Sequence, residues 1–278
     1  MEVMHVTIDS PLSSSYFDSF TSFTIDDYTG YGDPAFIACV KKYRDIILNE
    51  NAPGAVILKK KANIVYTVSF PEETGFPFQS IVVKKCLPRN VIMRLLQPLK
   101  KSKARRSFET ARYLIEHNLG TPQPLGYLEK RRGNLVLASY FVTENVEPCL
   151  KINQYLYYHS DNTEDINSLM HAVAEYITRM HASGLRHRDC NLTNFLLSPS
   201  GEGQRLVMID LNRARIKRRL SAFTRVNDIG RLYWKQYRPA FFKLFCEKNT
   251  NVARWEWFFN FYYWWRKKRR KIKRQINK

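Results

Sequence analysis

Alternating apolar and polar residues predict a group of β-strands in the first half of the chain. Three runs, 55-AVILKK-60, 64-IVYTVSF-70 and 79-QSIVVKKC-86, are rich in β-branched and aromatic residues. Polar or Pro/Gly segments separate them, as expected for strands joined by hairpins. A fourth run, 134-NLVLASYFVTEN-145, has the same character and is predicted to form a further hairpin. Together these runs predict a small antiparallel sheet.

Apolar residues at helical spacing predict three helices, over residues 34–49, 102–118 and 163–183. Gly184 follows the third helix at the position after the C-cap, where glycine is favoured. Residues 1–34 show little periodicity and are predicted to form an irregular arm. The third helix carries an apolar stripe that marks its core face: Ile166, Leu169, Met170, Val173, Ile177 and Met180.

A short motif follows the third helix, at 185-LRHRDCNLTNFLL-197. Its His-Arg-Asp tripeptide ends at Asp189, and four residues separate that aspartate from Asn194. This is the H-R-D-x-x-x-x-N spacing of a kinase catalytic loop. Downstream, the apolar run 206-LVMI-209 predicts a strand that ends at Asp210. The helix before the motif and the strand after it make the match stronger than the tripeptide alone.

The chemistry of phosphoryl transfer explains why these residue types occur together. The reaction needs a carboxylate that receives the proton of the attacking hydroxyl, and metal ligands that help to neutralise charge on the phosphates. Asp189 suits the first role. Asn194 and Asp210 suit the second, because Mg²⁺ prefers oxygen ligands and usually takes one or two carboxylates together with phosphates and water.

The segments 180-MHASGLRHRDCNLTNFLL-197 and 209-IDLNRARIKRR-219 resemble the lipopolysaccharide kinases of the Kdo/WaaP family, within the protein-kinase-like superfamily. In that family, sequences such as Asp-Leu-His-Arg-Ala replace the Asp-Phe-Gly of protein kinases. This chain has Asp-Leu-Asn-Arg-Ala from Asp210 onward. The resemblance extends over about residues 55–235.

The resemblance implies an α+β, two-lobed protein-kinase-like fold, with a small antiparallel-sheet N-lobe and a mainly helical C-lobe. ATP and Mg²⁺ are the implied cofactors, and Asn194 and Asp210 are expected to contact both. The implied division of the chain has four parts: an irregular N-terminal arm over 1–34, the N-lobe over 35–145, the C-lobe over 146–265 and a basic C-terminal tail over 266–278.

The family pattern also places a strand lysine and a helix glutamate beside the nucleotide. Lys84 is the preferred lysine, because its V-x-K spacing mirrors the A-x-K of the V-A-I-K motif. The competitor, Lys85, points to the other face of the strand. Glu109 is the preferred glutamate over Glu116, which lies near the C-terminal end of its helix, where a carboxylate is poorly placed for the helix dipole.

Three residues in or near the loop are predicted to support the structure and not to take part in catalysis. His181 belongs to the preceding helix, and His187 is expected to support the loop by hydrogen bonding without acting as the base. Asp228 resembles the helix aspartate with which the family braces its catalytic loop.

Two features depart from ordinary protein kinases. The first hairpin has no glycine, and three lysines at 59–61 stand there; they either offset phosphate charge or are merely solvated. Asn191 stands where most protein kinases carry a lysine, so a neighbouring cation such as Arg213 or Arg215 would have to supply the missing charge.

The function implied by the resemblance is ATP-dependent phosphorylation of a sugar hydroxyl, Kdo or heptose, in the lipopolysaccharide inner core. The acceptor would be a core or lipid A-linked sugar, and the enzyme would be peripheral on the cytoplasmic face of the bacterial inner membrane. Two alternatives stay open. One is a protein or small-molecule kinase, RIO-like or aminoglycoside-phosphotransferase-like; the other is a basic pseudokinase that acts as a binding module.

The charge composition agrees with an anionic partner. The chain has 45 Lys and Arg against 25 Asp and Glu, for a formal net charge of +20, which attracts nucleic acid, phosphorylated glycolipid or an anionic membrane. No nucleic-acid-binding motif accompanies this charge, so specific nucleic-acid binding is not expected. The five cysteines lack metal-ligand spacing and indicate reduced thiols. Neither a signal sequence nor a transmembrane span is predicted.

Two basic segments indicate where an anionic partner would bind. Residues 213–219 contain five Lys or Arg near the expected acceptor site. Nine of the 11 residues over 255–265 are aromatic, and nine of the 13 residues over 266–278 are Lys or Arg. This composition predicts peripheral contact with an anionic membrane. The alternative is a final C-lobe helix with core aromatics, followed by a disordered basic tail.

Overall fold

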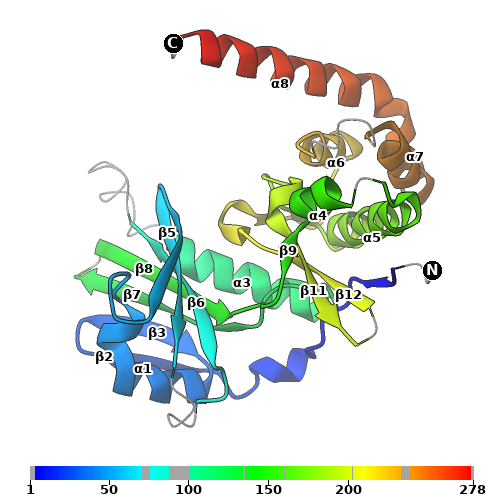
Figure 1. Ribbon diagram of the computed structural model, residues 1–278. Helices are drawn as coiled ribbons and strands as arrows, with labels where there is room; N and C mark the ends of the chain where they lie inside the picture. The colour runs from blue at the N-terminus through cyan, green and yellow to red at the C-terminus, as the bar shows by residue number, and fades with distance from the viewer. Residues whose placement is uncertain are drawn as a thin grey trace. The chain divides into compact units, whose positions relative to one another are not determined.

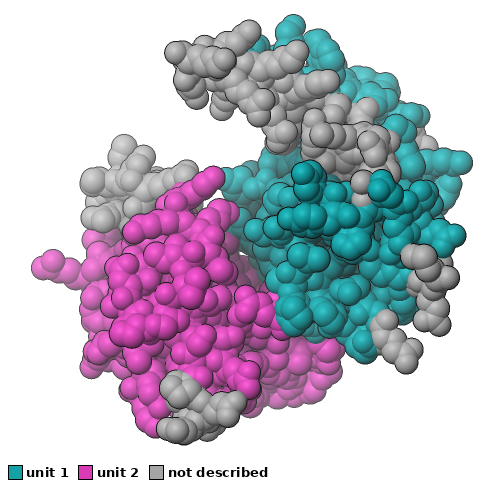
Figure 2. Space-filling view, viewed as in Figure 1, with its two compact units in different colours: residues 1–9, 148–278 teal, residues 10–147 magenta. Residues whose placement is uncertain are grey.

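The computed structural model of the chain describes residues 4–70, 76–87, 101–133, 135–159, 161–201, 203–232 and 238–276. These residues form two compact units, which Figure 2 shows in different colours. Unit 1 contains Met1–Asp9 and Pro148–Lys278, and unit 2 contains Ser10–Glu147. Each unit is described by itself.

Unit 2 is built on a seven-stranded sheet in the order β2-β3-β7-β8-β6-β5-β4, and every neighbouring pair is antiparallel (Figure 1). The three strands predicted from alternation are confirmed as β4, β5 and β6. The predicted hairpin over 134–145 is wrong, because that run forms the single strand β8, whose hairpin partner is β7. The strands are β2 (Thr21–Ile25), β3 (Tyr28–Gly32), β4 (Ala55–Lys60), β5 (Asn63–Ser69), β6 (Ser80–Cys86), β7 (Pro124–Arg132) and β8 (Leu135–Glu144).

The irregular arm predicted for residues 1–34 is also wrong. This segment contains β1 (Val6–Thr7), the 3₁₀ helix η1 (Ser14–Phe17) and the β2–β3 hairpin, which extends the sheet along β7. Its aromatic residues pack against distant parts of the chain, as when Phe17 and Phe20 meet Phe108. Such long-range burial leaves no local period, so the sequence pattern did not reveal these strands.

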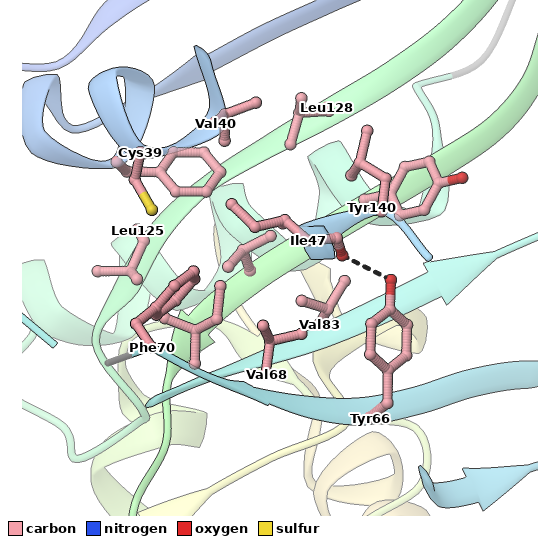
Figure 3. Packing of buried hydrophobic residues seen from close by; sticks show 14 of the residues in the cluster. Cys39, Val40, Ile47, Tyr66, Val68, Phe70, Val83, Leu125, Leu128 and Tyr140 are labelled. Atoms are coloured by element: carbon pink, nitrogen blue, oxygen red, sulfur yellow. Dashed lines mark hydrogen bonds between the residues drawn. The ribbon is translucent and has the colours of Figure 1, made fainter. Parts of the chain in front are cut away.

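One face of the unit 2 sheet packs against helix α1 (Pro34–Ile47) and forms a continuous hydrophobic core (Figure 3). The helix begins after Asp33, whose carboxylate accepts a hydrogen bond from the amide of Ala35 at 2.8 Å, as expected of an N-cap. Tyr66 of β5 is fully buried, and its hydroxyl donates to the carbonyl of Ile47 at 2.8 Å. This bond satisfies both a buried phenol and the end of the helix.

The opposite face of the same sheet packs against helix α3 (Lys103–Glu116). Phe108 of α3 contacts Tyr127 of β7 and Tyr31 of β3, with ring centroids 5.5 and 5.6 Å apart. The strand register places Tyr127 opposite Phe141, and Phe141 opposite Lys84. Lys84 therefore belongs to the face that α3 covers, because residues directly opposite in a sheet share a face.

Unit 1 is mainly helical and carries two small sheets, β1-β12-β11-β9 and β10-β13. The predicted core helix is confirmed as α5, with the whole predicted apolar stripe buried, and Gly184 follows it at φ 90°. The elements are β9 (Leu150–Lys151), α4 (Ile152–Tyr158), α5 (Thr163–Ala182), β10 (Leu185–Arg186), η4 (Leu192–Asn194), β11 (Phe195–Ser200), β12 (Gly203–Met208), η5 (Leu211–Arg213), β13 (Arg215–Ile216), α6 (Ala222–Ile229), α7 (Arg238–Lys248), η7 (Thr250–Trp255) and α8 (Glu256–Ile276).

The C-terminal segment is one continuous helix, α8, that passes through the boundary expected between a C-lobe and a tail at 265/266 (Figure 1). Phe259 is buried and stacks on Phe242 of α7. Trp257 is 65% exposed and Trp264 is 51% exposed. The core alternative therefore holds for Phe259 but is wrong for these tryptophans. No helix among the described residues is long and apolar enough to span a bilayer.

Candidate active site

The H-R-D-x-x-x-x-N segment lies in unit 1, between strands β10 and β11. Strand β10 pairs with β13, and β11 pairs with β12, so both ends of the segment are fixed by backbone hydrogen bonds. Strand β12 leads to Asp210. Two sequence motifs that are separated by the β11–β12 hairpin are thereby brought to the same edge of unit 1.

Asp228 of α6 holds the first part of this loop. It is fully buried, and its two carboxylate oxygens accept hydrogen bonds from the backbone amides of His187 at 2.9 Å and Arg188 at 2.7 Å. His181 of α5 donates to the same carboxylate at 3.2 Å. Burial raises the pKa of this carboxyl, but the bonds from His181 and His187 outweigh it and hold the pKa below its usual value. The predicted bracing role of Asp228 is confirmed.

His187 faces inward and acts on the backbone of the neighbouring strand. Its Nε2–H donates to the carbonyl oxygen of Ile209 at 3.1 Å, which assigns the proton to Nε2. Its Nδ1 is buried and has no hydrogen-bond partner among the described residues. Burial lowers the pKa of His187, so the ring is neutral. The prediction that His187 supports the loop is confirmed.

Asp189 is the half-buried acid of the loop, with 29% of its side chain exposed. Its Oδ2 lies 3.1 Å from Nη1 of Arg213, and its Oδ1 lies 3.5 Å from Nη1 of Arg231. Its carbonyl oxygen accepts hydrogen bonds from the side-chain amides of Asn191 and Asn194, each at 2.9 Å. These four contacts fix both the backbone and the carboxylate while leaving part of the side chain open to solvent.

Asn194 and Asp210 are joined through Ile209. The amide of Ile209 donates to the carbonyl of Asn194 at 2.9 Å, which continues the β11–β12 ladder by one residue. Asp210 then turns away from the strand at φ 63°, a left-handed conformation that is uncommon for a residue other than glycine. Asn212 donates from Nδ2 to Oδ1 of Asp210 at 3.1 Å. Such backbone outliers concentrate at functional sites.

The oxygen atoms of this region suit a hard divalent cation. The amide nitrogen of Asn194 is used by Asp189, so the amide oxygen is the atom that Asn194 can offer to a metal. Asp210 supplies a carboxylate. Among the described residues, no cluster of three or more His, Cys, Asp or Glu forms a metal site. Mg²⁺ does not require one, because it keeps several water molecules and is often bound by one or two carboxylates plus phosphates.

The structure places the two lysines of unit 2 that were predicted to compete for contact with a nucleotide on opposite faces of the sheet. Lys85 shares a face with Ile81 and Val83, on the side of α1, and its Nζ lies 2.5 Å from Oε2 of Glu50. Lys84 points to the face that α3 covers. Since the kinase pattern pairs the strand lysine with a helix glutamate, this placement favours Lys84.

The predicted partner of Lys84 is engaged elsewhere in unit 2. Glu109 of α3 accepts hydrogen bonds from Nζ of Lys101 at 2.8 Å and from Nε of Arg105 at 3.1 Å. Its competitor Glu116 pairs with Arg112 at 2.7 Å. The structure thus places Glu109 on the helix that covers the face of Lys84 but joins it to cations of its own segment.

Four further observations concern residues at or near the predicted site. The lysines over 59–61, in the glycine-free hairpin, are exposed. Asn191 caps η4 by accepting from the amide of Thr193 at 3.0 Å, so its amide has a structural task in the loop. Arg213, named above as a possible substitute for the missing lysine, contacts Asp189, whereas Arg215 donates to the carbonyl of Ala214. Arg231 was missed, because it is 42 residues from Asp189 and no motif marks it.

Comparison with known proteins places the site in a family context. The model of the lipopolysaccharide kinase (Kdo/WaaP) family matches residues 81–262, which include both motifs. The lipopolysaccharide core heptose(I) kinase WaaP of Escherichia coli K12 is 30% identical over 138 residues, which are 47% of this chain and 52% of that protein. The WaaP of Pseudomonas aeruginosa is 28% identical over the same length. The chain thus matches about half the length of these curated relatives.

A solved structure, described as WaaP in complex with acyl carrier protein, has a similar fold. It is 20% identical, covers 76% of this chain and 89% of its own, and superposes with a TM-score of 0.53. This likeness confirms the predicted α+β, protein-kinase-like fold, with an antiparallel-sheet unit and a mainly helical unit. Because the family model also covers well over half of the sequence, the chain belongs to the lipopolysaccharide kinase (Kdo/WaaP) family.

Proposed function

We propose that the protein is an ATP-dependent kinase that phosphorylates a sugar hydroxyl, Kdo or heptose, of the lipopolysaccharide inner core. The observation that carries the proposal is the assembly of Asp189, Asn194 and Asp210 at one edge of unit 1 in a chain of this family. A carboxylate beside two potential oxygen ligands is the minimum that phosphoryl transfer to an alcohol requires. The relatives named above are heptose kinases, which favours a core sugar as the acceptor.

The roles follow from the contacts of each residue. Asp189 receives the proton of the acceptor hydroxyl, and Arg213 and Arg231 hold its carboxylate in one orientation. Asn194 and Asp210 would hold Mg²⁺ through oxygen atoms, beside the nucleotide. ATP would supply the phosphoryl group, and Mg²⁺ would neutralise charge on its phosphates.

On the nucleotide side, Lys84 contacts the phosphates and Glu109 orients it. Because Glu109 is bound to Lys101 and Arg105 here, this role requires an exchange of its ion pairs. Glu109 is one-third exposed, and exposed pairs of this kind contribute at most about 1 kcal/mol each. The exchange is therefore within reach of the energy that nucleotide binding provides.

Arg213 compensates for the neutral Asn191 in this proposal. Its guanidinium lies beside the carboxylate of Asp189, which places it near the proposed acceptor hydroxyl. Because it is 60% exposed, it is accessible to a phosphoryl group that approaches that hydroxyl. An arginine in such a position stabilises the charge of the transferring phosphoryl group.

The acceptor is lipid-linked, and we propose that the enzyme meets it at the cytoplasmic face of the inner membrane. Helix α8 presents exposed aromatic side chains, among them Trp257, Phe261 and Trp264, and continues into a strongly basic end. Aromatic residues favour the headgroup region, and basic residues are attracted to anionic lipids. Both features support peripheral contact with an anionic membrane.

The acceptor can be identified with purified protein, MgATP and labelled phosphate. Lipopolysaccharide from a strain that lacks inner-core phosphate, dispersed in detergent, should become labelled, and mass spectrometry should locate the added phosphate on a Kdo or heptose residue. An aminoglycoside and a general protein substrate serve as controls for the other kinase classes. Labelling of either control in preference to lipopolysaccharide would reject the core-sugar assignment, and failure to bind MgATP would indicate a pseudokinase.

A further inference from the structure

Unit 1 contains a pocket that the phosphoryl-transfer site does not use. It has a volume of about 630 Å³ and lies between the start of α6 and the connection from α7 to η7. Four basic residues contribute to its wall: Arg219, Arg225, Lys248 and Arg254. None of the described residues that line it is acidic, although Lys248 is paired with Glu175 outside the lining at 2.6 Å.

Arg225, one of the arginines that line the pocket, has only part of its hydrogen-bonding capacity satisfied. Nη1 of Arg225 donates to Oδ1 of Asn249 at 3.0 Å, while its Nε is buried and has no hydrogen-bond partner among the described residues. Burial and the nearby charge of Arg219 both lower the pKa of Arg225. Arg219 and Arg225 both line the pocket, so their like charges repel each other, and an anion bound in the pocket would reduce that repulsion.

The helix that forms one side of the pocket adds further positive potential. Ser221, which lines the pocket, is the N-cap of α6, and its hydroxyl accepts from the amide of Thr224 at 3.3 Å. The amino end of a helix carries a partial positive charge and favours anions. The arginines and the helix end therefore act in the same direction.

Aromatic residues lie beside the pocket: Phe223 is exposed, and Trp255 and Phe258 are half-buried. Phe223 is the second residue of α6. Its ring centroid lies 4.5 Å from that of Phe258 and 5.7 Å from that of Trp255. Arg254 lines the pocket and also lies over the ring of Trp255 at 5.8 Å. In Figure 1, α6 and α7 lie near the start of α8 at one end of unit 1, which agrees with the contacts of α6 and α7 with η7 and of α6 with α8.

We propose that this pocket binds the phosphate group of an anionic lipid, with Phe223, Trp255 and Trp257 in the headgroup region beside it. The inference rests on the proposed contact with an anionic membrane and gives that contact a defined site. Arginine suits phosphate because its planar fork of N–H donors matches the phosphate oxygens. The aromatic side chains select a lipid over a soluble phosphate, since amphipathic rings are favoured at the membrane interface.

The test measures binding of the full-length protein to vesicles without nucleotide, so its failure is distinct from a failure of the kinase assignment. Three vesicle compositions are compared: phosphatidylcholine alone, phosphatidylcholine with phosphatidic acid, and phosphatidylcholine with an anionic lipid that contains no phosphate. The double variant Arg219→Gln/Arg254→Gln removes two exposed cations of the pocket. The control Lys41→Gln/Arg132→Gln removes the same charge from exposed positions of unit 2.

We expect the intact protein and the control to bind phosphatidic acid vesicles about equally. The pocket variant should bind them at least about 10-fold more weakly, because basic residues near an anionic surface contribute strongly. An equal loss in the control would show general charge attraction and overturn the proposal. Equal binding to the phosphate-free anionic vesicles would overturn the choice of phosphate.

The source of the phosphate is distinguished in the same experiment. Inorganic phosphate, added at the concentration of the lipid phosphate and at constant ionic strength, should leave vesicle binding by the intact protein unchanged. Release from the vesicles at that concentration would show that the pocket holds free phosphate as well as it holds lipid and would overturn the lipid assignment. The variant Arg225→Gln gives an independent reading of the same pocket, and a melting measurement confirms that each variant is folded. A folded Arg225→Gln protein with unchanged binding to phosphatidic acid would contradict the proposal.

Discussion

The H-R-D loop of unit 1 and the lysine and glutamate elements of unit 2 differ in how far their side chains already make the contacts that their proposed roles require. In unit 1, one buried carboxylate, Asp228, already holds two consecutive backbone amides of the loop and a histidine. In unit 2, Lys84 lies on the face that α3 covers, but Glu109 of that helix is bound to Lys101 and Arg105. In the proposed mechanism, the acceptor side is therefore assembled, while the nucleotide side has to exchange ion pairs.

The difference has a physical origin. The loop bonds are buried, and a buried hydrogen-bonding group that loses its partner is strongly destabilising, so this arrangement is kept in the absence of substrate. The pairs of Glu109 are one-third exposed or more, and such pairs are weak and readily exchanged. The comparison predicts that substitution of the buried group that holds the loop acts on stability, whereas substitution of the partly exposed Asp189 acts on catalysis and substitution of Lys84 acts mainly on nucleotide use.

The largest effect is expected from the acid of the loop. Asp189→Asn should lower turnover by about 10²- to 10⁴-fold, because the acceptor of the hydroxyl proton is lost. Binding of MgATP and the melting temperature should change little, since the asparagine keeps the shape of the side chain. Phosphate transfer by the purified variant measures the effect, with Asp45→Asn, a highly exposed aspartate of unit 2, as the control. Near-normal turnover of Asp189→Asn would remove Asp189 from the mechanism.

The next effect concerns the carboxylate that holds the loop. Asp228→Asn should reduce the free energy of unfolding by about 3–5 kcal/mol, because it breaks a buried network of a charge and its donors. Denaturant unfolding measures the change. Asp9→Asn, which breaks an exposed pair with Arg179, should lose less than about 1 kcal/mol. If the two variants were equally stable, the loop would not depend on Asp228.

The two adjacent lysines of β6 offer the sharpest test of unit 2. Lys84→Met should lower kcat/KM for ATP by about 10²-fold, since a cation that stabilises phosphate charge is removed. Lys85→Met should lose its pair with Glu50 and about 2 kcal/mol of stability, because both side chains are largely buried and the carboxylate is left without its cation, with kcat/KM changed only slightly. Steady-state kinetics on both variants separates the roles. The reverse order of effects would assign the nucleotide lysine to position 85.

The elements that sequence patterns predicted well are those whose neighbours in space are also neighbours in the chain. The α5 stripe and the β4–β5–β6 hairpins are of this kind. The β2–β3 hairpin was missed, because it gains its place through the pairing of β3 with β7, which lies far along the chain. The single strand β8 was read as a hairpin for a related reason: strand partners are set by the sheet and not by the run itself.

The residues of the candidate site fall into the same two groups: those that a local sequence pattern reveals and those that depend on contacts between distant parts of the chain. The spacing of Asp189, Asn194 and Asp210 could be read from the sequence because the chemistry requires those types in that order. The contact of Arg231 with Asp189 joins residues 42 positions apart and obeys no spacing rule. The choice between Lys84 and Lys85 depended on which face of the sheet α3 covers, and strand alternation alone does not determine that.

The smallest predicted effect is a pH dependence of stability that arises from His187. Its pKa in the folded protein is lowered from the ordinary value of 6.5, because the ring is fully buried. Below that ordinary value the unfolded chain binds a proton that the folded protein does not, so the unfolded state is favoured as the pH falls. The contribution of His187 to stability is therefore complete above about pH 6.5 and declines below it, by about 1.4 kcal/mol for each unit by which the pKa is lowered.

Unfolding free energies measured from pH 7.5 to pH 5 should fall with pH in the intact protein. His187→Asn should be less stable at every pH, since the bond to the carbonyl of Ile209 is weakened, but its stability should fall less steeply over this range. The same slope in both proteins would mean that the buried histidine of the loop does not control the acid sensitivity of unit 1.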